Sequence, residues 1–307
     1  MVRATRFTDP AAVDAWDSWF RWRDGDCLHD RTIDATWWRV ANAIVPRSPE
    51  GLRLAHRYVD AFSRWQLLPD ERLLRGAGTG ACMDALESPC AVLNVAAFVT
   101  APRTRHARFD DERFAGIAAL AVRLLDDALV ASRRMRADAI ALRVGLIGFA
   151  DALHLLGIDH EDARAIELVE LVGATLASGT LQGSLELARE RGALAPAPEH
   201  LLWSWRDRRV PDGLIDTAAW TGVRHSCLTA IEMQPLLASL ANGASDALEP
   251  RSLPRARDGA ATTHPAMSGN AGAASRRELY AAIQPWIDAP IDASLSLSTP
   301  TQQGVPS

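Results

Sequence analysis

The pattern of apolar residues predicts helices in the first quarter of the chain. Apolar side chains recur at helical spacing over residues 35–45 and again over 51–69, and Pro46 and Pro69 end the two patterns. The face of the first helix consists of Trp37, Val40, Ile44 and Val45. We therefore expect a helical N-terminal segment over residues 1–75.

Helical periodicity stops after residue 75. Gly76, Gly78 and Gly80 require loop conformations. The run Val92–Val99 is typical of a short buried strand, and we expect a second strand at Leu228–Ile231.

Longer helices are predicted further along the chain. Asp110, Asp111 and Glu112 favour a helix start, and an apolar stripe follows them at Phe114, Ile117, Ala121, Leu124 and Ala128. We expect Gly157 to cap the end of another segment. A long helix covers about residues 161–191 and ends at Gly192. Its interior Gly179 and Gly183 each cost about 1 kcal/mol relative to alanine, so we expect close packing there.

The C-terminal region has a different composition. Residues 251–276 are rich in Ala, Gly, Ser and Pro, which predicts a flexible linker. A short helix is expected over residues 277–297, and residues 298–307 are expected to be a disordered tail.

Composition narrows the class of protein. The 307 residues are 48% hydrophobic and carry a net charge of −5, which predicts a globular protein that binds neither nucleic acid nor membranes. All 33 basic residues are arginines, which excludes lysine-based chemistry. The N-terminus has no apolar signal-peptide core, and four cysteines do not make a disulfide framework. We expect a cytoplasmic location and reduced thiols.

Histidines and tryptophans carry weaker signals. No histidine or cysteine pair has metal-ligand spacing, and His200, His225 and His264 are expected at the surface or in loops. The ten tryptophans, among them Trp16 and Trp19, are expected in the core or on a partner surface.

Seven segments resemble, in order, the large chain of ribonucleotide reductase, most like the adenosylcobalamin-dependent class. They are "RWQLLPDERLLRGAGT", "SPCAVLNVAAFV", "FDDERFAGIAALAVRLLDDAL", "RVGLIGFADALHLLGI", "GSLELARERGA", "RHSCLTAI" with "ANGASDALEP", and "AAIQPWIDAPIDASL". Between Thr79 and Cys82 the family has a long segment that forms the first half of its ten-stranded barrel. The resemblance therefore implies a mainly helical α/β fold over residues 76–250, a remnant of that barrel that is not closed.

The resemblance also implies candidate catalytic residues. The family's radical-carrying cysteine corresponds to Cys82, its general-base carboxylate to Asp84, and its substrate-binding asparagine to Gly80. Cys90 resembles one of the two cysteines that reduce the substrate. Its family partner lies in the missing half, and no cysteine follows Cys227. The alternatives are that Cys82 is a small residue in a glycine-rich turn and that Cys90 is a buried apolar residue.

The family's phosphate-binding loop corresponds to residues 233–238 here. Its glycine and hydroxyl residues are replaced by Met233, Gln234, Pro235, Leu236, Leu237 and Ala238. Pro235 lacks a backbone donor, so we expect phosphate binding in the family's manner to be lost. Gln234, Ser239 and Gly80 remain the candidates for contacts with a ribonucleotide.

Two functions follow from the resemblance, and whether the chain is an enzyme stays open. The first is ribonucleotide reduction for DNA synthesis with adenosylcobalamin, with impaired activity. The second is an inactive descendant that acts as a binding or interaction module. In either case we expect apolar surface to be exposed on the N-terminal tryptophan segment and on the strand after Cys90. The chain should then form a homo-oligomer or bind a complementing chain.

Overall fold

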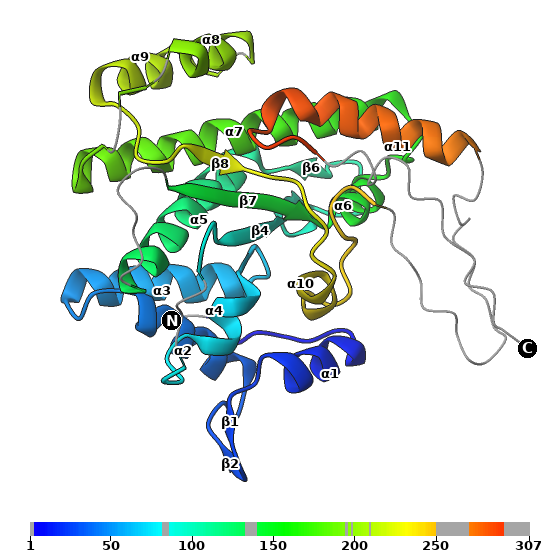
Figure 1. The fold of residues 1–307 in the computed structure, drawn as a ribbon. Helices are drawn as coiled ribbons and strands as arrows, with labels where there is room; N and C mark the ends of the chain where they lie inside the picture. The colour runs from blue at the N-terminus through cyan, green and yellow to red at the C-terminus, as the bar shows by residue number, and fades with distance from the viewer. Residues whose placement is uncertain are drawn as a thin grey trace, which may run out of the picture.

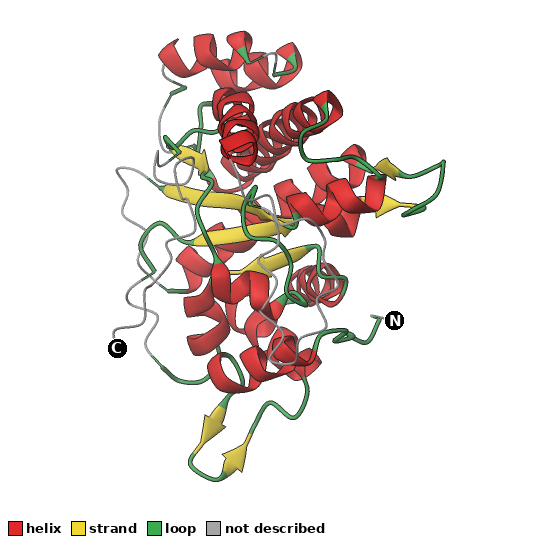
Figure 2. Ribbon diagram, turned by 90° about the vertical axis from the view of Figure 1, so that its right-hand side faces the viewer, coloured by secondary structure: helices red, strands yellow, loops and turns green. Residues whose placement is uncertain are grey.

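The computed structural model describes most of the chain as helices around one small sheet (Figures 1 and 2). The described residues are 3–81, 86–132, 140–193, 196–197, 199–208, 210–249 and 270–291. The expected linker up to residue 269 and the expected tail lie outside them. None of the described helices is long and apolar enough to cross a membrane.

The central sheet has four strands in the order β3-β4-β7-β8. They are β3 (Leu67–Pro69), β4 (Cys90–Asn94), β7 (Ala141–Ile147) and β8 (Cys227–Thr229). Strands β4, β7 and β8 are parallel, whereas β3 is antiparallel to β4. Within the described residues this sheet is open, with β3 and β8 at its two edges, which confirms the prediction of an unclosed α/β remnant.

Two long helices cover one face of the sheet. Helix α5 (Asp111–Ala131) packs on β3, β4 and β7, and α7 (Ala163–Arg191) packs on α5 and β8. A Cβ atom added at Gly179 or Gly183 would lie 2.6 or 2.7 Å from a carbonyl oxygen of α5. The prediction of close packing at these two glycines is therefore confirmed. Helix α11 (Asn270–Ile283) lies against α7 and starts before the expected residue 277.

The N-terminal helices lie on the side of the sheet away from α7 (Figure 1). Helix α2 (Ile33–Ile44) packs on α3 (Pro49–Ser63), and α1 (Pro10–Trp19) packs on α10 (Pro235–Leu240). The Oδ1 atom of Asn242 accepts a hydrogen bond from the Thr8 amide at 2.7 Å. The start of the chain is thus attached to the segment that follows β8.

Shorter elements complete the described fold. The helices are α4 (Glu71–Gly76), α6 (Phe149–Leu156), α8 (Glu199–Asp207) and α9 (Asp212–Thr221), with the 3-10 turns η1 (Val95–Phe98) and η2 (Gln284–Trp286). Two hairpins pair β1 (Arg23–Asp24) with β2 (Cys27–Leu28), and β5 (Val99–Thr100) with β6 (Arg108–Phe109). Gly157 ends α6 in the left-handed conformation, as predicted.

Two expectations about the sheet region are wrong. The helical pattern over residues 51–69 ends at Ser63 rather than Pro69, because Trp65 adopts a positive φ of 56° and the chain turns into β3. The strand after Cys90 is not exposed: Ala91 and Leu93 are completely buried between neighbouring strands and α5. In the N-terminal segment Trp16 is buried and Trp19 is 53% exposed.

The outer edge of β8 is covered by the segment after η2. One carboxylate oxygen of Asp288 accepts hydrogen bonds from the backbone amides of Leu228 and Thr229 at 2.9 and 3.2 Å. The Ala289 amide donates to the Thr229 carbonyl at 3.1 Å. These residues occupy the backbone groups that an added strand would need.

We expect Asp288→Ala to lower the free energy of unfolding by about 2 kcal/mol, because it removes two charge-assisted bonds to backbone amides. It also removes the ion pair with Arg208, whose Nη1 lies 3.1 Å from the carboxylate. Urea denaturation measures the effect. The control is Asp216→Ala on the exposed side of α9, and equal stabilities of the two variants would contradict the edge contact.

Candidate functional site

Cys90 is buried at the first position of β4. Its side chain is 7% exposed, and its backbone amide donates to a carboxylate oxygen of Asp70 at 2.9 Å. Asp70 caps α4 and forms an ion pair with Arg72 at 2.6 Å. Burial, assisted by the Asp70 carboxylate, raises the pKa of the Cys90 thiol to about 12. The thiol is therefore protonated at neutral pH.

Gln234 lies beside Cys90, although the two residues are far apart in sequence. The Cys90 Sγ lies 3.9 Å from the Gln234 Oε1, within range of a weak S–H donor. The chain after β8 turns back across the sheet, and Glu232 on this stretch forms an ion pair with Arg143 of β7 at 2.9 Å. The fold thus brings together two of the candidate site residues.

The Asp246 carboxylate accepts the hydrogen bond from the last backbone amide before α10. Its carboxylate oxygens lie 2.8 and 3.0 Å from the Gln234 amide nitrogen. The next residue, Pro235, has no amide hydrogen to offer. Burial raises the pKa of Asp246 to about 6. A negative group supplied by the chain itself therefore lies where an anionic ligand would approach this amide.

The raised pKa of Asp246 makes stability depend on pH. The folded chain binds a proton at this carboxyl more tightly than the unfolded chain, so the free energy of unfolding falls as pH rises from about 4 to 6. Asp246→Asn keeps an acceptor without the charge. We expect it to stabilise the protein by about 2 kcal/mol at pH 7.5 and to leave stability unchanged at pH 4.

Denaturant titrations of both proteins at the two pH values measure this difference. Asp216→Asn, at an exposed position of α9, controls for the general loss of one negative charge. If Asp246→Asn changed the free energy of unfolding equally at both pH values, burial would not be destabilising the ionised carboxylate.

A second buried polar cluster joins α5, α7 and the residues before β8. The Ser184 Oγ lies 2.8 Å from the His225 Nδ1, and the His225 Nε2 lies 3.3 Å from an Asp126 oxygen. Arg224 also contacts Asp126, at 2.8 Å. His225 lies in a loop, as expected, but it is buried.

This cluster has the residue types of a hydrolase catalytic triad, but a substrate cannot reach its serine. Burial lowers the pKa of His225, so its contact with Asp126 is a hydrogen bond from a neutral ring. Ser184 is 1% exposed and has no surface from which to attack a substrate. We assign the cluster to stability.

A comparison with models of protein families shows which family this chain belongs to. Residues 88–250, just over half of the 307 residues, match the family model described as the ribonucleotide reductase barrel domain. The chain belongs to this family. A comparison with curated proteins gives no match. Cys90, Gln234 and Asp246 all lie within the matched part of the ribonucleotide reductase barrel domain.

The other site residues that the family resemblance suggests are not brought into contact with Cys90 and Gln234 within the described residues. Cys82 and Asp84 lie outside the described residues, so their assigned roles stay predictions. Gly80 has a φ of +84° in an open turn. Ser239 lies in α10, and within the described part of the chain no hydrogen bond joins its side chain to Cys90 or Gln234. Asp246 was not predicted as a site residue, because nothing in its local sequence points to Gln234.

The described residues contain no group of three or more His, Cys, Asp or Glu side chains that could hold a metal ion. The Cys90 thiol is 7% exposed and contacts Gln234, and Cys82, the expected radical carrier, lies outside the described residues. Burial likewise raises the pKa of Cys227, to about 11. We derive no catalytic step through the cofactor.

Proposed function

We propose that this member of the ribonucleotide reductase family is an impaired descendant that does not reduce ribonucleotides on its own and acts as a binding module. The observation that carries the proposal is the Asp246 carboxylate at the amide of Gln234, 2.8 Å away. In the family the corresponding loop would receive substrate phosphate through backbone amides.

Phosphate binding is opposed by charge repulsion as well as by the loss of the loop's hydroxyl groups. A phosphate placed near the Gln234 amide would meet the Asp246 carboxylate, and two unit charges 4 Å apart repel by about 1–4 kcal/mol at dielectric constants of 80–20. Pro235 removes the adjacent donor at the same time. The loop before α10 therefore offers a phosphate neither a favourable charge nor two adjacent backbone donors.

Calorimetry with nucleoside di- and triphosphates tests the proposal. We expect dissociation constants weaker than about 1 mM for the chain alone. The double variant Pro235→Gly with Leu236→Thr should not rescue binding, because Asp246 remains in place. Micromolar affinity of the unaltered chain would overturn the proposal.

A second candidate is the family's reaction, carried out with adenosylcobalamin in an assembly that supplies the missing half of the barrel. The match of residues 88–250 to the family's barrel domain favours it. The covered edge of β8 argues against strand addition at that side. Either a homo-oligomer or a complementing chain could supply the missing residues.

The assay for this candidate uses the chain copurified with its natural partners, adenosylcobalamin and a ribonucleotide. Formation of deoxyribonucleotide that is lost in Cys82→Ala but kept in Cys27→Ala would establish the reductase. Cys27 is exposed in the β1–β2 hairpin and serves as the matched control. No product with any copurified partner would leave the binding module as the function.

A further inference from the structure

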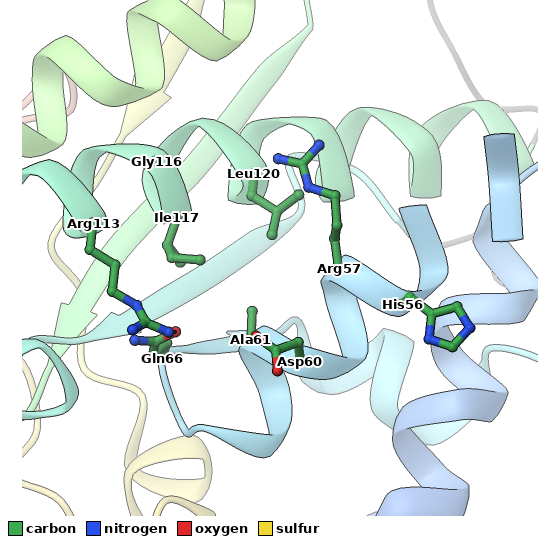
Figure 3. Close-up of a pocket in the computed structure, with 9 residues that line it drawn as sticks. All are labelled: His56, Arg57, Asp60, Ala61, Gln66, Arg113, Gly116, Ile117 and Leu120. Carbon is green, nitrogen blue, oxygen red and sulfur yellow. Dashed lines mark hydrogen bonds between the residues drawn. The ribbon is translucent and has the colours of Figure 1, made fainter. Parts of the chain in front are cut away.

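An open pocket of about 510 Å³ lies between α3 and α5. It shares no residue with the Cys90 cluster. Arg57 and Asp60 of α3 line one side, Arg113 of α5 lines another, and Gln66 follows α3 (Figure 3). The volume is within the range of small-molecule sites.

The pocket carries two positive charges that no carboxylate neutralises within the described part of the chain. Arg113 donates a hydrogen bond to the amide oxygen of Gln66 at 3.2 Å, and Arg57 has neither an ion pair nor a hydrogen bond there. The one carboxylate on the wall, Asp60, forms an ion pair with Arg64 at 2.9 Å. The pocket is therefore suited to an anion.

Gln66 provides an amide donor at the same place. The residue is 3% exposed, and its Oε1 accepts the bond from Arg113. Its Nε2 makes no hydrogen bond within the described part of the chain. The Nε2 atom is therefore accessible to solvent rather than buried, and a ligand acceptor in the pocket can bind it together with Arg113.

The pocket floor between the two arginines is apolar. Ile117 and Leu120 form it, and a Cβ atom added at Gly116 would meet nothing within 4 Å. In Figure 3, Arg113 and Gln66 lie at one end of this floor and Arg57 lies near Leu120. The arrangement matches a molecule with an acidic group at each end and a short apolar chain between them.

We propose that this pocket binds a small organic dianion, namely a dicarboxylate with a short apolar chain. One carboxylate faces the Arg113 guanidinium and the Gln66 amide, and the other faces Arg57. The proposal does not depend on whether the chain reduces ribonucleotides.

The test is calorimetry on the full chain at low ionic strength with succinate, glutarate and adipate, and with butyrate as the matched single acid. We expect at least one dicarboxylate to bind with a dissociation constant of about 1 mM or lower, and about tenfold more tightly than butyrate. Failure of all three dicarboxylates to exceed butyrate would overturn the proposal.

Variants locate the binding. Arg57→Gln and Arg113→Gln should each weaken the dicarboxylate about tenfold, whereas Arg53→Gln should leave binding unchanged. Arg53 is the control because it lies on α3 with its side chain 71% exposed. Gly116→Leu should fill the floor and abolish binding without unfolding the chain, since leucine favours a helix. Unchanged affinity in Gly116→Leu or in both arginine variants would contradict the site.

Discussion

Asp126→Ala is expected to destabilise the protein by about 3–5 kcal/mol, because it leaves buried positive charge without its partner. Asp126 is completely buried and contacts Arg191, Arg224 and His225. Burial opposes ionisation of Asp126, but the bonds from His225 and Arg224 dominate and lower its pKa below the ordinary value. The loss is a large part of a typical total stability of about 5–15 kcal/mol.

Thermal and urea unfolding measure this loss, with Asp111→Ala as the control on the same helix. Asp111 is exposed in the first turn of α5, where its interaction with the helix dipole contributes at most about 1 kcal/mol. A similar small loss in Asp126→Ala would show that Arg224 finds another partner or solvent. A loss of several kcal/mol would establish the cluster as a main support of the α5–α7 layer.

Local sequence signals predicted the helices of this chain better than its sheet. The start of α5 at Asp110 and the end of α6 at Gly157 follow from capping, which depends on neighbours within one turn. Strand β7 escaped prediction because most of it is buried on both faces, and such a strand has no alternating pattern. The burial of β4 likewise depends on neighbours that are distant in sequence, so local signals did not predict it.

The candidate site shows the same division. The family resemblance directed attention to Cys90 and Gln234, and the fold places them 3.9 Å apart. The position of Asp246 depends on how the chain folds back after α10, so no local pattern could reveal its carboxylate at the Gln234 amide. His225 was expected at the surface or in a loop, and it is buried because its partners come from α5 and α7.

Gly183→Leu is expected to cost about 3 kcal/mol, because the added side chain meets backbone rather than a movable side chain. A Cβ atom at this position would lie 2.7 Å from the Ala119 carbonyl oxygen and 2.8 Å from its Cα. Helices α5 and α7 would have to separate, and the packing of α5 on the sheet would be disturbed with them. The free energy of unfolding from urea titration measures the cost.

The matched control is Gly116→Ala, also at a glycine within a helix of this pair. Its added Cβ would meet nothing within 4 Å, so alanine should stabilise the chain by up to about 1 kcal/mol through helix propensity. Opposite signs for the two substitutions would show that contact, not helix propensity, fixes glycine at position 183. If Gly183→Leu stabilised the protein, α5 and α7 would not be in close contact at this point. That result would contradict the close-packed helix layer that supports the open sheet.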